Sequence, residues 1–231
     1  MAPTIHLKPT APLAERVLLP GDPGRALLLA QTLLEQPKMF NHNRGLWGYT
    51  GRAADGELLT VQSSGMGGPS AAIVITELTE LGARRILRVG TCGALDPDLR
   101  LGELLVATSA IATDGTSLAL GASTRVGGDP ELTDALLAAG GARPGLVAST
   151  DLFYDERDGR AERWASAGAV AVEMETATLF VLAGRLGLAA ASLLVVSDLL
   201  RPTRTRIEPQ ALLEAEQRLG ALAFAALTRR K

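Results

Sequence analysis

The sequence predicts an α/β protein, a three-layer α/β/α sandwich around a twisted, mixed sheet. Short apolar runs typical of buried strands alternate with segments whose apolar residues recur at helical spacing. The most continuously apolar run extends from Ala189 to Val196. Strands buried on both faces and separated by amphipathic helices are typical of such sheets. The 231 residues contain no internal repeat, so we expect a single domain over residues 1–231.

Composition narrows the classes of function. The formal net charge is −2, which does not favour nucleic-acid binding, because that usually requires a basic surface. An anionic substrate must therefore be held by local arginines. One cysteine, Cys92, and two histidines do not supply a typical zinc site, so we expect no metal. There is no apolar run near about 18 residues and no signal-peptide core, so we expect a cytoplasmic protein without membrane contact.

The first quarter of the chain predicts an arm, a strand–helix unit and a hairpin. Residues 1–14 are proline-rich and aperiodic, as in an extended arm. After the apolar run 17–19, Asp22 can cap a helix that has Pro23 in its first turn. Free N–H groups at such a helix start favour anions. Two strands, at 45–52 and 57–63, are joined by Asp-Gly, which signals a hairpin.

Residues 61–95 predict a strand, a glycine loop, a helix ending at Gly82, a strand at 84–89 and a second glycine turn at 90–93. Both loops then follow strands, at the carboxyl ends where open α/β sheets bind ligands. Arg88 lies inside the second strand among apolar neighbours. A buried arginine needs an anionic partner, and either an internal carboxylate or a bound oxyanion fits this pattern.

The rest of the chain continues the alternation. We expect strands at 103–113, 146–149, 170–172 and 189–196, and helices at 131–141, 176–187 and 208–227. Residues 156–168 are polar at first and then helical. Residues 114–130 read as an irregular surface segment and 199–207 as a basic loop. Three strand ends carry residues suited to ligand binding or catalysis, and each residue set also has a purely structural explanation. Phe153-Tyr154 could fill the core, and Glu173-Met174-Glu175 could complement a helix dipole. Ser197-Asp198 could form a turn.

Six segments in order resemble the nucleoside phosphorylase I family, which includes hexameric bacterial purine nucleoside phosphorylases and uridine phosphorylases. They span nearly the whole chain and read LLPGDPGRA (18–26), GMGGPSAAIVITEL (65–78), LGARRILRVGTCGAL (81–95), STDLFY (149–154), VEMETATLF (172–180) and VVSD (195–198). The resemblance implies the family fold and a reaction in which a nucleoside and inorganic phosphate give a free base and ribose 1-phosphate. Phosphate is a co-substrate, and no cofactor is implied.

The resemblance also implies which residues bind each part of the substrates. Phosphate requires backbone N–H groups and bidentate arginines. The residues that match the phosphate site are Gly21, Arg25, Arg88 and Thr91, with Arg44 from a neighbouring subunit. Those that match the ribose site are Met66, Met174 and Glu175, with His6 lent by a partner. The expected base site comprises Cys92, Gly93, Phe153, Val172, Glu173, Ser197 and Asp198. We therefore expect a homohexamer, a trimer of dimers, with shared sites.

Asp198 matches the acid that protonates purine N7 as the base departs. The arginine that usually assists it lies about a dozen residues further on, near Ala211, and is missing here. Arg204 or Arg206 could replace it. Ser197-Asp198 favours purines over the uridine alternative, for which Arg157 is the remaining support. Nucleosidases that act on methylthioadenosine or adenosylhomocysteine use water and need no phosphate-binding arginines, so Arg25, Arg44 and Arg88 argue against this class. A non-enzymatic nucleoside-binding protein would need neither these arginines nor the acid Asp198, so their joint presence argues against that reading.

Overall fold

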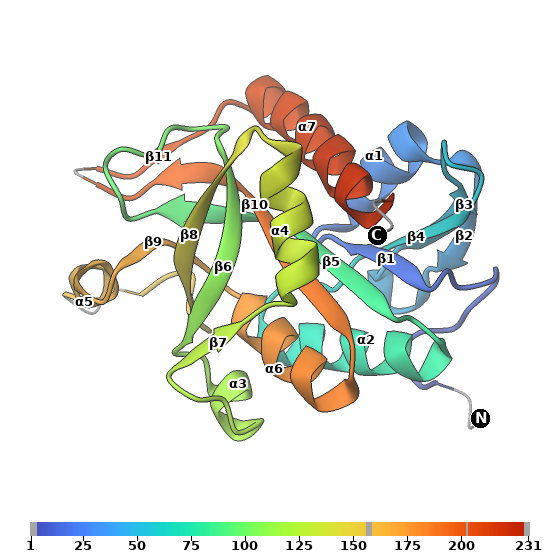
Figure 1. Cartoon of the computed structure of the whole chain (residues 1–231), viewed down its shortest axis with the longest axis horizontal. Coiled ribbons are helices and arrows are strands. Elements are labelled where there is room, and N and C mark those ends of the chain that lie inside the picture. The colour runs from blue at the N-terminus through green and yellow to red at the C-terminus, as the bar shows by residue number, and fades with distance from the viewer. Residues whose placement is uncertain (1–3, 156–158, 202, 229–231) are drawn as a thin grey trace.

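One mixed sheet forms the middle layer of the molecule (Figure 1). The computed structural model describes residues 4–155, 159–201 and 203–228. In the described part, the strand order is β11-β10-β6-β8-β9-β5-β1-β4-β3-β2, and β7 pairs with β6. The strands are β1 (Arg16–Leu19), β2 (Glu35–Asn41), β3 (Gly48–Arg52), β4 (Leu58–Gln62), β5 (Arg85–Ala94), β6 (Leu104–Ala112), β7 (Arg125–Gly127), β8 (Ala142–Ser149), β9 (Ala169–Glu173), β10 (Ala189–Leu199) and β11 (Thr205–Arg206).

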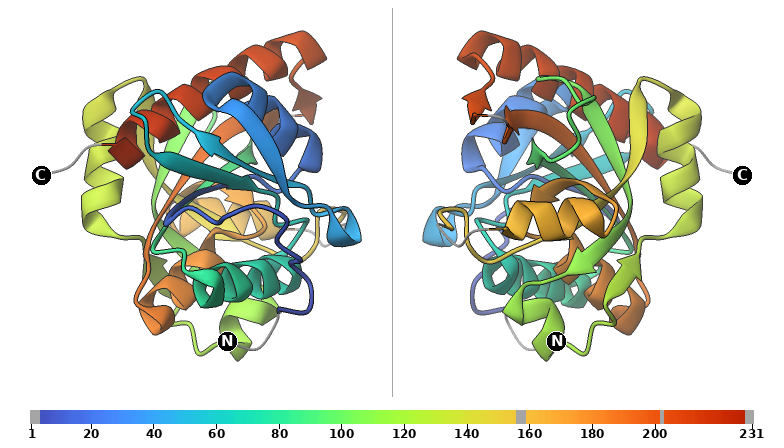
Figure 2. Two further views of the ribbon diagram at one scale, coloured as in Figure 1. Left: turned by 90° about the vertical axis from the view of Figure 1, so that its right-hand side faces the viewer. Right: turned by 90° about the vertical axis from the view of Figure 1, so that its left-hand side faces the viewer.

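Helices cover both faces of this sheet, as Figure 2 shows. One outer layer contains α1 (Pro23–Leu33), α4 (Pro130–Ala139) and α7 (Pro209–Thr228), and the other contains α2 (Gly68–Leu81), α3 (Gly115–Ala119) and α6 (Thr176–Leu186). Alternate residues of β5 enter the two cores, since Ile86 packs on the α2–α6 side and Leu87 on the α1–α7 side. The predicted α/β/α sandwich is confirmed. The short helices η1 (Asn43–Gly45) and α5 (Arg160–Ser166) lie outside these layers.

Part of the sheet closes on itself. β5 and β10 pair in parallel along their whole length, from Arg85 with Ala189 to Ala94 with Leu199. β10 also pairs with β6, and β6, β8 and β9 lead back to β5. The ring of strands places the carboxyl ends of β5 and β10 side by side. Strand pairs this far apart in sequence carry no local signal, so the closure was not predicted.

The second glycine turn, expected at residues 90–93, is wrong. β5 continues through these residues to Ala94, because β10 pairs with it on one side and β9 pairs with Gly93 and Ala94 on the other. Glycine is nonetheless required in this stretch. A Cβ added to Gly90 would lie 2.7 Å from the guanidinium carbon of Arg88, which folds over the strand at this point.

Three further elements differ from the expectations. β2 was missed, and it is an edge strand interrupted by Pro37 that pairs with β3 alone. Residues 114–130 contain α3, capped by the buried Asp114, and the strand β7. The basic loop contains β11, which pairs antiparallel with the end of β10. The hairpin, the Asp22 cap and the left-handed helix end at Gly82 are confirmed.

One buried carboxylate helps to hold the N-terminal arm against the body. Glu77 of α2 accepts hydrogen bonds from the backbone N–H groups of Ile5, His6 and Leu7, and its Oε1 lies 2.7 Å from Nδ1 of His6. Burial alone would raise the pKa of Glu77, but the bonds from Leu7 and His6 outweigh it and hold that pKa below its usual range. Among the described helices, none is long and apolar enough to cross a membrane.

Candidate active site

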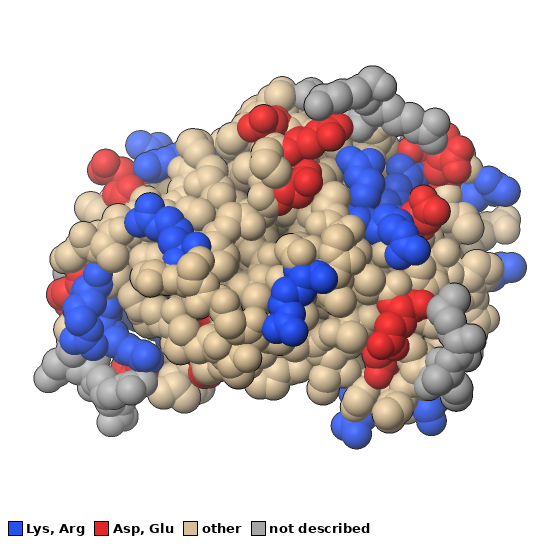
Figure 3. Space-filling model, turned by 60° about the horizontal axis from the view of Figure 1, so that its bottom comes forward, with Lys and Arg blue, Asp and Glu red and all other residues tan. Residues whose placement is uncertain are grey.

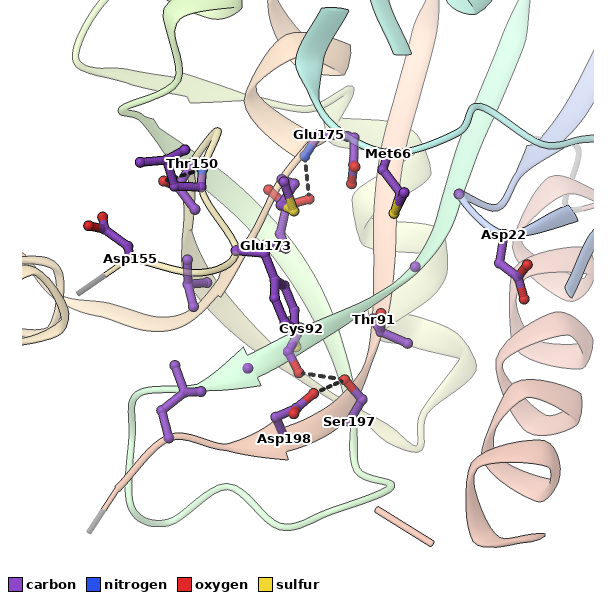
Figure 4. A pocket seen from close by; sticks show the side chains of 18 of the residues that line it. Asp22, Met66, Thr91, Cys92, Thr150, Asp155, Glu173, Glu175, Ser197 and Asp198 are labelled. Atoms are coloured by element: carbon purple, nitrogen blue, oxygen red, sulfur yellow. Dashed lines mark hydrogen bonds between the residues drawn. The ribbon is translucent and has the colours of Figure 1, made fainter. Parts of the chain in front are cut away.

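A cavity of about 1010 Å³ opens where the ends of β5, β9 and β10 meet. Figure 4 shows Glu173 and Glu175 at one end and Ser197 and Asp198 at the other. Every residue that the sequence placed in the site lines this cavity except His6. The cavity-lining members of that set are Gly21, Arg25, Arg44, Met66, Arg88, Thr91, Cys92, Gly93, Phe153, Val172, Glu173, Met174, Glu175, Ser197 and Asp198.

The start of α1 forms one wall of the cavity. Asp22 caps the helix by accepting hydrogen bonds from the N–H groups of Gly24 and Arg25, at 3.0 and 3.2 Å. Gly21 lies directly against the glycine loop after β4, since a Cβ at this position would lie 3.0 Å from the carbonyl oxygen of Gly65. The two loops thus bring backbone groups to one side of the cavity, and the N-terminal end of a helix favours an anion there.

Arg25 extends from the first turn of α1 into the protein interior. It is 7% exposed, and its Nε donates to Oε1 of Glu216 on α7 at 2.8 Å. One terminal nitrogen donates to the carbonyl oxygen of Val89 at 3.3 Å. Glu216 was not predicted as a site residue, although a carboxylate among the apolar residues of the last helix was a usable signal in the sequence.

Arg88 contacts two internal carboxylates. Its Nε lies 3.1 Å from Oε2 of Glu173, and a terminal nitrogen lies 2.6 Å from Oε2 of Glu175. Although burial lowers the pKa of Arg88, the charges of Glu175 and Glu173 outweigh it and raise that pKa, so the guanidinium stays charged. Of the two partners left open by the sequence, the structure contains the internal carboxylates.

Glu173 and Glu175 differ in what they offer to a ligand. The side chain of Glu173 is fully buried. It accepts hydrogen bonds from the hydroxyl of Ser149 and from the backbone N–H groups of Glu175 and Thr176 at the start of α6. Both oxygens therefore have protein partners, as in the helix-complementing alternative. Base binding by Glu173, which also lines the cavity, stays a prediction.

Glu175 bridges the arginine and the glycine loop. One oxygen pairs with Arg88, and the other accepts a hydrogen bond from the N–H of Gly67. Burial raises the pKa of Glu175, and the ion pair with Arg88 offsets this only in part. The carboxylate is 9% exposed and lines the cavity, so its position allows contact with a bound hydroxyl.

Asp198 lies at the far end of the cavity, one residue beyond a bulge in β10. Its Oδ2 accepts a hydrogen bond from the hydroxyl of Ser197 at 2.7 Å, which is also within 3.3 Å of the carbonyl oxygen of Cys92 (Figure 4). Its Oδ1 accepts from Nε of Arg204 at 2.9 Å, and Nε of Arg206 lies 3.4 Å away. β11 brings both arginines here, because Arg206 pairs in register with Asp198.

Phe153 forms an aromatic wall beside this acid. Phe153 is 49% exposed, and its ring packs edge-on against Tyr154, with centroids 5.0 Å apart. The guanidinium of Arg204 lies 4.3 Å over the ring of Phe153. Cys92 lines the same cavity, and burial raises the pKa of its thiol above the usual range, so the thiol is protonated and apolar in character. Arg157, the residue that favoured uridine, lies outside the described residues.

His6 and Arg44 were both expected from a partner subunit. In this chain, His6 is bonded to Glu77 and is absent from the described lining of the chain's own cavity. Arg44 lies exposed in η1, with a left-handed φ of 58°, and it does line the rim of its own cavity. The two residues are connected through the backbone, because Asn43 donates a hydrogen bond to the carbonyl oxygen of His6 at 2.8 Å.

Known proteins match this chain over nearly its full length. Residues 15–230 match the phosphorylase superfamily. The DeoD-type purine nucleoside phosphorylase of Geobacillus kaustophilus (strain HTA426) is 41% identical over 198 residues, which cover 82% of this chain and 83% of that protein. The protein of the same name from Caldanaerobacter subterraneus subsp. tengcongensis is 40% identical over 196 residues, covering 80% and 83%.

A solved structure has the same fold. The crystal structure of uridine phosphorylase from Vibrio fischeri ES114, complexed with 6-hydroxy-1-naphthoic acid, superposes with a TM-score of 0.85. The match covers 94% of this chain and 93% of that chain, at 27% sequence identity.

Proposed function

This chain belongs to the phosphorylase superfamily, and we propose that it is a purine nucleoside phosphorylase. It would convert purine ribonucleosides or 2′-deoxyribonucleosides and inorganic phosphate into the free base and the pentose 1-phosphate, without a cofactor. One observation carries the proposal: a single cavity contains two buried arginines at one side and a buried, hydroxyl-bonded aspartate at the other. The distribution of charge matches a reaction that brings in an anion and releases a basic heterocycle. A cytoplasmic location is part of the proposal, since the single cysteine, Cys92, is buried and unpaired.

Phosphate would bind on the side formed by the start of α1 and by β5. The N–H groups near Gly21, the hydroxyl of Thr91 and the guanidinium groups of Arg25 and Arg88 all border that side. Arginine forks match the geometry of phosphate oxygens. The buried carboxylate partners of Arg88 hold this arginine in place before the ligand arrives, which limits the entropy lost on binding.

The pentose would lie beside Glu175 and Met174. Cleavage of the glycosidic bond builds positive charge on the sugar ring, as in glycosidase chemistry. Phosphate on one face and the carboxylate of Glu175 can stabilise that charge electrostatically. The raised pKa of Glu175 makes this carboxylate sensitive to what occupies the site, because a cation beside it favours the ionised form.

The purine would stack near Phe153 and place N7 toward Asp198. As the C–N bond breaks and its electrons move into the ring, Asp198 in its acid form would transfer a proton to N7, while a phosphate oxygen forms the new bond to C1′ of the pentose. The carboxylate that remains on Asp198 is negative. Arg204, at 2.9 Å, would stabilise that negative charge. We therefore propose Arg204 in the place of the missing arginine near Ala211, with Arg206 as a weaker, more exposed neighbour.

Uridine phosphorylase is the second candidate, supported by the fold match to the Vibrio fischeri enzyme. Two observations favour purines. The relatives with about 40% identity are DeoD-type purine nucleoside phosphorylases. Asp198 is also available to protonate a ring nitrogen, and pyrimidines have no N7. A water-using nucleosidase is the third candidate, against which Arg25 and Arg88 argue.

The assembly belongs to the same proposal, as a homohexamer in which a neighbour lends His6 and Arg44. Much of the face formed by α2, α3 and α6 is uncharged, as Figure 3 shows. Exposed apolar side chains occur on it and at the cavity mouth, among them Ile73, Leu118 and Met66. Mixing Arg44→Ala with Arg88→Ala subunits tests the sharing: restored activity supports a lent Arg44, and its absence supports an Arg44 that serves its own chain.

The deciding experiment is a phosphate-dependent assay of the purified protein with adenosine, inosine, guanosine and uridine. We expect release of free purine and formation of pentose 1-phosphate only when phosphate is present. Faster cleavage of uridine than of any purine nucleoside would favour the uridine alternative. Cleavage at the same rate without phosphate would identify a nucleosidase instead.

A further inference from the structure

Glu216 is a buried carboxylate that none of the steps above uses directly. It lies on α7, 191 residues from its partner Arg25, and the two side chains are 11% and 8% exposed. Its neighbours along the helix, Ala215 and Leu219, are buried core residues. Burying a carboxylate here costs free energy unless the charge is paired, and Arg25 supplies the pairing cation. The question is what the buried pair contributes beyond this.

Protein groups occupy some of the guanidinium nitrogens of Arg25 and leave donors on the others. Glu216 accepts from Nε at 2.8 Å, and the carbonyl oxygen of Val89 accepts from one terminal nitrogen at 3.3 Å. Guanidinium carries five N–H donors, so further donors on the terminal nitrogens remain for another ligand. In the described lining of the cavity, Arg25 is present and Glu216 is not, so Glu216 lies behind the arginine.

We propose that Glu216 is a positioning residue for Arg25, setting the direction in which its terminal nitrogens face an oxyanion. The inference rests on the proposed function, because it takes the oxyanion to be inorganic phosphate. Val89 directly precedes Gly90 and Thr91, so the second anchor ties Arg25 to the strand that also carries Arg88. The C-terminal helix thereby takes part in building a phosphate site that it does not touch.

Two conservative substitutions separate position from charge. Glu216→Gln keeps an oxygen at the same reach but removes the charge, whereas Glu216→Asp keeps the charge and withdraws it by about 1.5 Å, one C–C bond. If Glu216 acts by position, Glu216→Asp raises the apparent KM for phosphate about tenfold. Glu216→Gln then stays within about twofold of wild type, and the KM for the nucleoside stays the same in both variants.

If Glu216 only links α1 to α7 structurally, a different pattern of effects is expected. It would lower the melting temperature without singling out phosphate, and its effect would persist after Arg25 is removed. In an Arg25→Ala background, our proposal expects Glu216→Asp to cause no further rise in the phosphate KM. Glu214→Asp, on the exposed side of the same helix, is the matched control and should leave both KM values unchanged.

The opposite ranking of the two variants, or a Glu216→Asp effect that persists without Arg25, would overturn the proposal. Thermal melting with inorganic phosphate gives a readout that needs no turnover: wild type and Glu216→Gln should be stabilised, and Glu216→Asp less so. A wild type without phosphate-dependent cleavage of any nucleoside would overturn the proposed function, while melting still decides the role of Glu216. An Arg25→Ala variant with a wild-type phosphate KM and phosphate-induced stabilisation would overturn both the place of Arg25 in the phosphate site and the role of Glu216.

Discussion

Nε of Arg204 lies 2.9 Å from Oδ1 of Asp198, so a residue of a surface loop contacts the carboxylate that we propose as the acid. The same guanidinium lies 4.3 Å over the ring of Phe153. Arg204 therefore joins two segments that border the base end of the cavity. Ala211, where related purine enzymes are expected to carry the assisting arginine, is an exposed residue of α7. The contact came from pairing β11 with β10, not from the last helix.

Replacing Arg204 should slow the chemical step. We expect Arg204→Ala to lower kcat for inosine and adenosine about tenfold or more, because the carboxylate left after proton transfer loses a charged donor. Steady-state kinetics with saturating phosphate measure this. Arg201→Ala is the control, since Arg201 pairs with Glu162 instead. Equal small losses in both variants would remove Arg204 from the mechanism.

Asp198→Asn should affect adenosine far more than inosine. The amide cannot supply the proton that N7 needs, and general acids typically contribute about 10²-fold or more. A 6-amino purine depends most on a group that reaches both N7 and the exocyclic nitrogen. The ratio of kcat/KM values for the two nucleosides is the measurement. Ser197→Ala, which removes only one hydrogen bond to Asp198, should cause a smaller loss of kcat/KM that is similar for the two nucleosides. Equal losses of kcat/KM on both nucleosides in Asp198→Asn would contradict the assigned role.

Arg88→Ala should impair both stability and phosphate binding. The substitution leaves Glu173 and Glu175 buried without their cation, and breaking a buried pair typically costs about 3–5 kcal/mol. We expect a lower midpoint in urea denaturation together with a raised apparent KM for phosphate. Arg88→Lys should give values between those of wild type and Arg88→Ala, because it keeps the positive charge but a single ammonium cannot make all the guanidinium contacts. An unchanged phosphate KM in a folded variant would exclude Arg88 from the phosphate site.

The tie between Glu77 and the N-terminal arm should be lost in acid. The pKa of Glu77 is lowered on folding, so its stabilising contribution is present above the usual carboxyl pKa of about 4.3 and disappears as pH falls through the lowered value. We expect Glu77→Gln to reduce the free energy of unfolding at pH 7 by about 1–3 kcal/mol. That difference should shrink below about pH 4.3.

Urea denaturation across this pH range tests the prediction for Glu77. Glu80→Gln, on the exposed side of the same helix, is the control. A deficit in Glu77→Gln that stays constant from pH 7 into acid would show that the carboxylate charge is not what holds the arm.

The local chemistry of the sequence determined much of the fold. Asp22 and Pro23 fix where α1 begins, Asp55-Gly56 turns the hairpin, and Gly82 ends α2 in the left-handed conformation, because each depends on residues only a few positions apart. The alternation of apolar strands and amphipathic helices was similarly sufficient for the three layers. The site residues came from the family resemblance, and fifteen of the sixteen line one cavity.

Contacts between distant residues were decided only by the tertiary structure. The sequence left open whether Arg88 faces an internal carboxylate or a bound oxyanion. Its contacts with Glu173 and Glu175 form because β9 ends beside β5, and phosphate binding by Arg88 stays a prediction. Arg25 found Glu216 because α7 packs on α1, and Arg204 reached Asp198 because β11 returns along β10. Gly90 to Gly93 remained in the strand because β10 continued alongside. In each case the contact joins residues that are far apart in the sequence. Its free energy depends on how the elements pack, which the local sequence pattern does not specify.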